Sequence, residues 1–517
     1  MALAGNIVLP SSRFVTHINT ITGFIWIPML KRFLFALSAA FLILIAIVIT
    51  NTLSHTAIPP SQSYSPFELA LNKAEISEKL AAAIRIRTIA ERDKVQSNAT
   101  AFLKLHHHLE NSFPRVHQHL ERTKINEFSL LYKWQGTDPQ LKPIMLTAHQ
   151  DVVPANPSSL DQWEQPPFSG NIDEHFIWGR GALDNKSGVV GILEAVEHLL
   201  KLGFIPKRTV YLGFGHDEEV GGEQGAKQIA EYLKVNNISL EFLLDEGGAV
   251  IKDHVIPGIV SPIALVGIAE KGYLTLEVTT TGASGHSSMP PKQTAAGKLS
   301  ETIVAIEANP MPANIEYMEM MFSNMLHKLP FIQRMAFSNS WLFQPMLEKV
   351  LGEKSATNAA IRTTTAVTML DAGVSENVLP TTATATINFR TLPTDNSEDI
   401  ISHLKQVTGL SDDHFVVKAD KNATRISATD SFAFNTIHNT IHEVIDNKEL
   451  IVAPYLMVGG TDSKHFEEVS ENQYRFLIAS LDREDQKRIH GINERISIED
   501  YSLMVKFYFR FLQNSAF

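Results

Sequence analysis

Four polar motifs end or follow short apolar stretches of this chain, and this recurring pattern most limits how it can fold. The motifs are His149-Gln150-Asp151, Asp184-Asn185-Lys186, Glu218-Glu219 and Asp245-Glu246. In an open α/β sheet, the carboxyl ends of the strands converge on one binding crevice. Carboxylate and imidazole ligands delivered to such a crevice suit metal ions. The pattern therefore predicts one shared polar site that can hold metal.

Strand and helix patterns alternate around these motifs. Strands are expected at residues 128–134, 144–148, 209–215 and 240–244, and helices at 189–202 and 225–235. Alternation of this kind is typical of a sheet with helices on both faces. We therefore predict an α/β catalytic domain with a mixed central sheet flanked by helices.

The pattern changes between residues 264 and 420. The expected order there is strand, helix, strand, strand, helix, strand, which is the split βαβ arrangement of an α+β (ferredoxin-like) domain. This lid domain would be inserted into a catalytic domain built from residues 66–263 and 421–517. An apolar segment, residues 318–351, interrupts the lid and carries Trp341-Leu342-Phe343. It could line a substrate channel or an interface, but buried packing is the favoured interpretation.

Length, charge and cysteine content narrow the function. The 517 residues allow two or three domains, because single cores rarely exceed about 300 residues. A formal net charge of −11 argues against a general nucleic-acid surface. The chain has no cysteine, so a metal must be bound by histidine and carboxylate side chains.

Residues 33–50 form an uncharged apolar stretch that follows Lys31-Arg32. Its length just suffices for a bilayer-spanning helix, and the basic flank would keep residues 1–32 in the cytoplasm. The alternative is a cleaved signal peptide starting at Met29. Residues 51–65, with Pro59-Pro60, are expected to be a linker. Either interpretation places the rest of the chain outside the cytoplasm, as a membrane-anchored, secreted or periplasmic protein.

Six motifs together resemble the dinuclear zinc metallopeptidase and aminoacylase family, which includes carboxypeptidase S and acetylornithine deacetylase. In chain order they are His149-x-Asp151, Gly179-Arg180-Gly181-Ala182-x-Asp184-x-Lys186, Glu218-Glu219-x-Gly221-Gly222, Asp245-Glu246-Gly247-Gly248, Gly285-His286-Ser287-Ser288 and His490-Gly491-x-Asn493-Glu494. The resemblance covers about residues 66–515 and is strongest to the carboxypeptidase S branch.

The resemblance implies two zinc ions per subunit. Asp184 would bridge them, because each of its oxygens can serve one ion. His149 and Asp245 would complete one site, and Glu219 and His490 the other. His465 competes with His490 for the last position, and His490 is preferred because its sequence setting and its place before the final helix match the family.

The same resemblance assigns the catalytic roles. Glu218 would be the general base, and Asp151 would orient His149. Because neighbouring residues on a strand face opposite ways, Glu218 and Glu219 need a turn to share the site, and Gly221-Gly222 makes one plausible.

The lid would supply further groups. His286 resembles the family histidine that donates to the oxyanion, often at the site of a partner subunit, which implies a homodimer formed through the lid. Asn377 and Arg390 match polar lid positions. Arg390, with Gly460 and Thr461, could bind the substrate carboxylate. The alternative for Arg390 is a surface ion pair.

These expectations point to hydrolysis of an amide bond next to an amino acid with a free carboxylate. The small-molecule substrate would be a peptide or an N-acyl-amino acid, and the reaction could run in reverse. Two alternatives stay open. One is a membrane-tethered, metal-containing binding protein without turnover. The other is an interaction scaffold built on residues 318–351.

Overall fold

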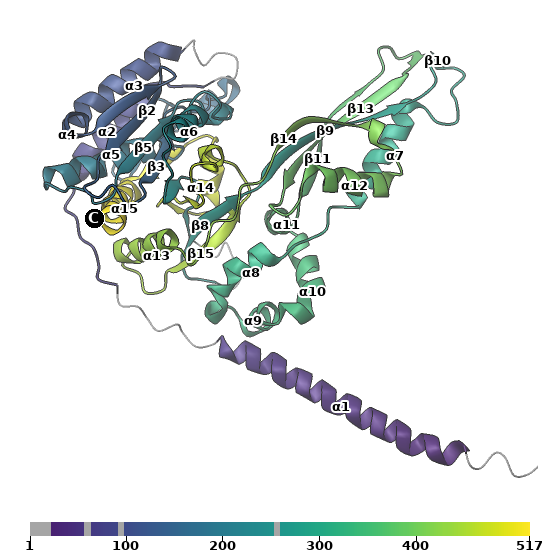
Figure 1. Ribbon diagram of the computed structural model, residues 1–517. Helices are drawn as coiled ribbons and strands as arrows, with labels where there is room; N and C mark the ends of the chain where they lie inside the picture. The colour runs from purple at the N-terminus through teal and green to yellow at the C-terminus, as the bar shows by residue number, and fades with distance from the viewer. Residues whose placement is uncertain (1–21, 56–63, 91–97, 253–258) are drawn as a thin grey trace, which may run out of the picture.

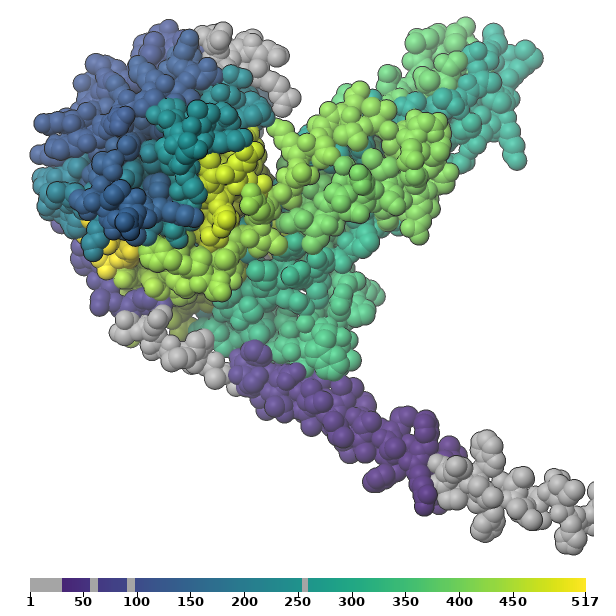
Figure 2. Space-filling model, viewed as in Figure 1, coloured from purple at the N-terminus to yellow at the C-terminus, as the bar shows by residue number. Residues whose placement is uncertain are grey.

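The computed structural model describes residues 22–55, 64–90, 98–252 and 259–517. Figure 1 shows a rounded domain that carries most of the expected site residues, named the catalytic domain for that reason, an elongated lid that projects from it, and a long N-terminal helix that points away from both. In the space-filling view, a notch separates the catalytic domain from the far half of the lid (Figure 2). The mixed α/β catalytic domain and the α+β lid confirm the fold class expected from the sequence.

The catalytic domain is built on a ten-stranded mixed sheet with the order β1-β2-β5-β3-β6-β16-β8-β7-β17, and β15 pairs with β8 outside this path. Strands β5, β3, β6 and β16 are parallel neighbours. The strand bounds are β1 Glu121–Ile125, β2 Ser129–Trp134, β3 Ile144–His149, β5 Val210–Gly215, β6 Phe242–Asp245, β7 Val250–Ile251, β8 Ile263–Glu270, β15 Ile451–Met457, β16 Gln473–Arg475 and β17 Ser480–Leu481.

Helices cover both faces of this sheet, which is why its central strands are continuously apolar. On β3, Ile144 and Leu146 belong to the main core with α5 and α15, whereas Met145 packs on the opposite face with α6. The helices of this domain are α2 Lys73–Arg85, α3 Ala99–Ser112, α4 Pro114–His119, α5 Lys186–Lys201, α6 Ala226–Val235, α13 Phe432–Val444, α14 Arg483–Arg488 and α15 Ile498–Ala516.

The lid has a four-stranded antiparallel sheet, β11-β13-β9-β14, packed against two helices. Its elements are β9 Gly272–Thr281, α7 Ala295–Ala308, β11 Thr364–Ala372, β13 Thr382–Thr391, α12 Ser397–Thr408 and β14 Phe415–Lys421. Because β8 pairs within the catalytic sheet, the lid begins at Gly272 rather than at residue 264. A short ladder of β10 (Gly285–His286) and β12 (Val378–Leu379) lies at its far tip (Figure 1).

The segment between α7 and β11 forms a helical insert that packs on the edge of the catalytic sheet. It comprises α8 Glu316–Ser323, α9 Phe331–Ser338, α10 Ser340–Gly352 and α11 Ser355–Ile361. Met321, Phe322 and Met325 form its core with Ile263 of β8 and Ile451 of β15. The favoured interpretation of buried packing therefore holds for this inner side. The outer side differs, because Trp341 remains 59% exposed.

The N-terminal helix α1 (Thr22–Ser54) is longer than the apolar stretch of residues 33–50. It also includes residues 51–54, so the expected linker starts later than residue 51, and residues 56–63 of that linker lie outside the described part of the chain. Residues 30–54 are long and apolar enough to cross a membrane, a property that an N-terminal signal sequence shares. Length and hydrophobicity therefore do not distinguish a membrane anchor from a signal peptide.

Candidate metal centre

Three side chains from separate sheet connections meet at the carboxyl ends of the central strands. His149 ends β3, Asp184 lies just before α5, and Glu219 lies in a 3₁₀ turn after β5. One ligand atom of each falls within 4.8 Å of those of the other two. The Asn185 side chain caps α5 by accepting a hydrogen bond from the Gly188 N–H at 3.0 Å, which places Asp184 at the start of this helix.

Asp184 lies between two imidazoles and presents one oxygen to each. Its Oδ1 is 2.9 Å from Nε2 of His149, and its Oδ2 is 3.0 Å from Nε2 of His490. His490 Nε2 also lies 3.0 Å from Oε2 of Glu219. A carboxylate placed in this way can serve two cations at once, with one imidazole on each side.

The structure places Glu246, rather than Asp245, beside His149. Glu246 Oε1 lies 3.0 Å from Nε2 of His149. The Asp245 carboxylate instead accepts hydrogen bonds from the backbone N–H groups of Glu246 at 2.9 Å and Ser463 at 2.9 Å. Because successive residues at a strand end face opposite ways, only one of the two can point at the centre. The carboxylate of the expected ligand Asp245 therefore faces these backbone N–H groups.

His465, the alternative to His490, lies outside the cluster. Its Nε2 is 2.9 Å from the backbone oxygen of Gly221, and burial lowers the pKa of its imidazole to about 4. The structure therefore brings His490, and not His465, to Asp184.

Asp151 organises the turn that lets Glu218 and Glu219 share the site. Its two carboxylate oxygens accept the backbone N–H groups of Glu218 and Glu219, each at 3.1 Å. Its Oδ1 also lies 3.3 Å from Nδ1 of His149, which leaves the Nε2 of that ring facing Asp184. The following Gly221 and Gly222 have φ values of 117° and 73°, a conformation that favours glycine.

A buried ion pair, Arg180–Glu494, joins the two loops that carry Asp184 and His490. Glu494 Oε2 accepts from Arg180, and Oε1 accepts the N–H of Leu183 at 2.9 Å. Arg180 also donates to the backbone oxygen of His490 at 3.1 Å. Both residues stand inside the sequence motifs described above, and that position is the only sequence signal for this pairing.

The electrostatics of the cluster fit bound cations. Burial raises the pKa of Glu218 well above its usual range, and burial together with the Asp184 charge raises that of Glu246 to about 8. Conversely, hydrogen bonding to Asp184 and Glu219 raises the pKa of His490 to about 10. Glu219 Oε1 is buried and has no hydrogen-bond partner. Several carboxylates buried this close together repel one another unless positive charge lies between them. These residues therefore fit a metal centre.

A cavity of about 200 Å³ opens beside the cluster. Asp184, Glu218, Glu246 and His490 contribute to its wall, as do Gly460 and Thr461, which were expected to bind substrate. The rest of the wall is mainly apolar, with Ala249, Met457, Leu477, Leu481 and Ile489. The described lining residues include no lysine or arginine. The cavity therefore suits a molecule with an apolar portion.

The structure does not bring the expected lid residues to this cavity. His286 belongs to β10 at the far tip of the lid, where the backbone oxygen of Asn377 accepts the Ser287 N–H at 3.1 Å. Arg390 is exposed on β13, with its guanidinium 4.7 Å from the ring centre of Tyr273. Within one subunit, none of these three residues lines the cavity.

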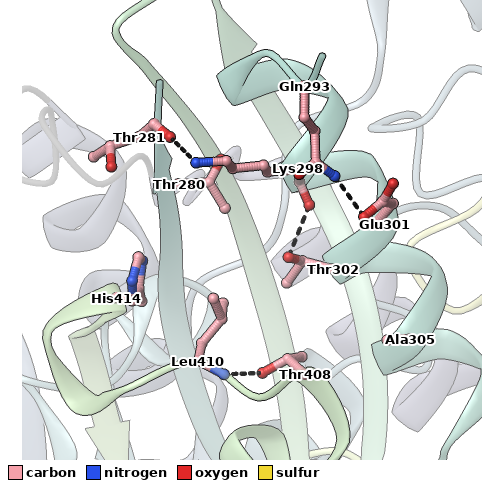
Figure 3. A pocket seen from close by; sticks show the side chains of 10 residues that line it. All are labelled: Thr280, Thr281, Gln293, Lys298, Glu301, Thr302, Ala305, Thr408, Leu410 and His414. Atoms are coloured by element: carbon pink, nitrogen blue, oxygen red, sulfur yellow. Dashed lines mark hydrogen bonds between the residues drawn. The ribbon is translucent and has the colours of Figure 1, made fainter. Parts of the chain in front are cut away.

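A second, larger hollow of about 500 Å³ lies on the lid between α7 and the end of α12 (Figure 3). Its polar groups largely satisfy one another: Lys298 donates to the Thr281 oxygen at 2.9 Å, and Gln293 donates to Glu301 at 2.6 Å. It is remote from the acidic cluster, so we place the chemistry in the smaller cavity.

Comparison with known proteins agrees with this geometry. Residues 145–514 match the model of peptidase family M20/M25/M40, a range that includes every residue of the cluster. The chain belongs to this family. M20 peptidases are metal-dependent, typically on zinc, and the protein is therefore an enzyme of the metallopeptidase and amidohydrolase class.

Individual relatives of this M20 family member cover most of the chain. A probable carboxypeptidase S-like 2 of Dictyostelium discoideum is 39% identical over 91% of this chain and 92% of its own length. The N-fatty-acyl-amino acid synthase/hydrolase PM20D1 of Xenopus tropicalis is 41% identical over 86% of each chain. Among solved structures, an M20 metallo-carboxypeptidase from Sulfolobus solfataricus shares the fold, with a TM-score of 0.59, 19% identity and coverage of 86% of this chain and 99% of that one.

Proposed function

We propose that this M20 enzyme hydrolyses an amide bond next to an amino acid with a free carboxylate. The observation that carries the proposal is the position of Asp184, with His149 and His490 on its two oxygens and Glu218 in the same cavity wall. A carboxylate shared by two imidazoles, next to a buried acid, is the arrangement expected of a two-metal hydrolase.

Two zinc ions would be held by two sets of residues that share Asp184. One set adds His149 and Glu246, and the other adds Glu219 and His490. When bound, the ions would polarise the scissile carbonyl and make a water molecule acidic enough to attack it. Asp245 would support the first set by holding the Glu246 and Ser463 backbone.

Glu218 would move the proton. It would accept a proton from the attacking water and deliver it to the leaving amine nitrogen, so that the amide C–N bond breaks to give a carboxylate and an amine. Burial supports this role, because a raised pKa lets a carboxyl group both accept and return a proton. Asp151 would keep Glu218 in place by accepting a hydrogen bond from the backbone N–H of Glu218.

The apolar cavity wall favours an N-acyl-amino acid over a polar peptide. Ala249, Met457 and Leu477 would contact an acyl chain or an apolar side chain. This preference agrees with the relatives that are named N-fatty-acyl-amino acid synthase/hydrolase. Other relatives are named carboxypeptidase S, so peptides cleaved at the C-terminus are the second candidate substrate class. Synthesis is the same reaction run backwards.

Completion of the site would require a second subunit. Because β10 lies at the tip of the lid, His286 would donate to the oxyanion of a partner's site in a homodimer, with Asn377 beside it. Arg390 would bind the substrate carboxylate only after the lid moves toward Gly460 and Thr461.

We further propose that α1 anchors the chain and leaves the catalytic domain on the extracytoplasmic side.

The test is a substrate panel assayed on the full chain in detergent, with zinc measured on the same sample. N-acyl-Phe, N-acyl-Leu and Gly-Leu should release free amino acid, and a chelator or Glu218→Gln should abolish release. Full activity of the glutamine variant would reject the mechanism. Stoichiometric zinc and tight ligand binding without any release would instead favour a binding protein.

A further inference from the structure

We propose that the outer side of the helical insert rests on the lipid bilayer at the level where α1 leaves it. The inference depends on α1 being retained as a membrane helix, and it does not depend on the proposed reaction. It assigns a partner, the interfacial layer of a bilayer, to a surface of α9 and α10.

The first observation is that α1 and the insert are joined by hydrogen bonds to one buried side chain. Asn339, between α9 and α10, is fully buried. Its amide donates to the backbone oxygen of Val48 at 3.2 Å and accepts from the Asn51 side chain at 3.1 Å. Its nitrogen also lies 3.3 Å from Oγ1 of Thr52. The end of α1 is thus fixed to the insert, and Figures 1 and 2 show them in contact.

The second observation is the depth at which this contact occurs. The membrane-compatible part of α1 has 25 residues, Leu30 to Ser54, or about 37 Å of helix. A hydrocarbon core is about 30 Å thick, so a helix of this length reaches both interfaces. With Lys31 and Arg32 at one interface, the polar Asn51 and Thr52 fall at the other. Asn339 therefore holds the insert at the level of the lipid headgroups.

The third observation is an exposed apolar face on α9 and α10, which we call the insert face. It consists of Phe331, Ile332, Trp341, Leu342, Met346 and Val350. Ile332 is 71% exposed and Trp341 59%. The opposite side of the same helices packs into the protein through Ala336, Leu347 and Leu351. Single exposed apolar residues are normal, but six on two adjoining helices form a patch that indicates a binding surface.

A bilayer fits this face because of its composition as well as its position. Short amphipathic helices with tryptophan, phenylalanine and leucine on one side lie in membrane interfaces, with basic residues toward the headgroups. Of the charged residues on these two helices, Arg334 is half-buried and Lys349 lies next to Glu348, so the fit to a bilayer depends on the exposed aromatic and aliphatic side chains. The insert face would therefore hold the catalytic domain in a fixed orientation against the membrane.

The absence of cysteine makes the test direct, because one introduced cysteine can be labelled selectively in the full chain. Ile332→Cys and Val350→Cys place a bimane fluorophore on the insert face. Matched controls are Val235→Cys on the catalytic domain and Val374→Cys on the lid. The side chains at these two positions are highly exposed, as at the two test positions. Each full-length variant is reconstituted into phosphatidylcholine and phosphatidylglycerol vesicles that contain nitroxide-labelled lipid, after its circular dichroism spectrum and thermal unfolding midpoint are shown to equal those of the unmodified chain.

We expect lipid nitroxides to quench bimane at positions 332 and 350 several-fold more strongly than at positions 235 and 374. Equal quenching at all four positions would overturn the proposal. So would a chain that does not remain with the vesicles. Protection of positions 332 and 350 from aqueous quenchers without lipid quenching would also overturn it, and would assign the insert face to a second copy of the chain.

Discussion

The Glu246 carboxylate approaches His149 Nε2 to 3.0 Å, whereas the carboxylate of the adjacent Asp245 is occupied by two backbone N–H groups. We therefore expect Glu246→Gln to lose one of the two zinc ions that the proposed mechanism requires. Asp245→Asn should keep both and bind one of them about 10- to 100-fold more weakly, as loss of a supporting group does. Zinc content and competitive chelator titration of the purified variants check this. Loss of an ion in Asp245→Asn alone would reverse the assignment.

Glu218→Gln should lower kcat by about 100- to 10,000-fold, because removal of a general base costs that much. Zinc content should stay unchanged, since Glu218 is not in either set of ligands. The matched control is Glu223→Gln, which removes a half-exposed acid paired with Lys227 on the same segment and should leave kcat intact. If the two variants lose activity equally, Glu218 has no special role.

Asp151→Asn should impair the turn after β5 without removal of a ligand. An asparagine oxygen can accept one of the Glu218 and Glu219 N–H groups, but its amide nitrogen would face the other donor. We expect kcat to fall about 10- to 100-fold, which is typical of lost orienting groups. The pH dependence of kcat should shift as well, a change that a purely structural role would not cause. An unchanged pH profile would contradict the orienting role.

Acid should destabilise the folded protein partly through His106. Burial lowers the pKa of His106 to about 4, whereas an unfolded histidine titrates near about 6.5. Between these values the unfolded chain binds the extra proton, so stability falls as pH falls from 6.5 to 4, by about 1.4 kcal/mol for each unit of pKa difference.

The His106→Gln variant isolates this effect. Glutamine can replace the contact of Nε2 with the Phe128 oxygen, which is 3.0 Å long, but does not titrate. The urea midpoint of the variant should therefore depend less on pH between 4 and 6.5 than that of the unmodified chain. Near pH 7 to 8, the two midpoints should show the same dependence on pH. Parallel curves across the acid range would exclude His106 as a source of the acid sensitivity.

The fold followed closely from local patterns. Continuous apolar strands such as β3 indicated a sheet covered on both faces, and the later order of strands and helices indicated the α+β lid. The boundary at residue 264 was misplaced because β8 and β9 are separated only by Lys271. Two consecutive strands that belong to different sheets look like one long strand in sequence, and only their pairing partners distinguish them.

The sequence by itself determined which chemistry this chain can carry: without cysteine, its metal ligands must be imidazoles and carboxylates, and these stand at strand ends that converge. Tertiary structure decided which of two adjacent acids, Asp245 or Glu246, faces His149, because backbone direction at a strand end depends on the neighbouring loops. It also decided that His286 lies far from its own centre and that Trp341 stays exposed. Both depend on how whole domains pack, which no local sequence pattern encodes.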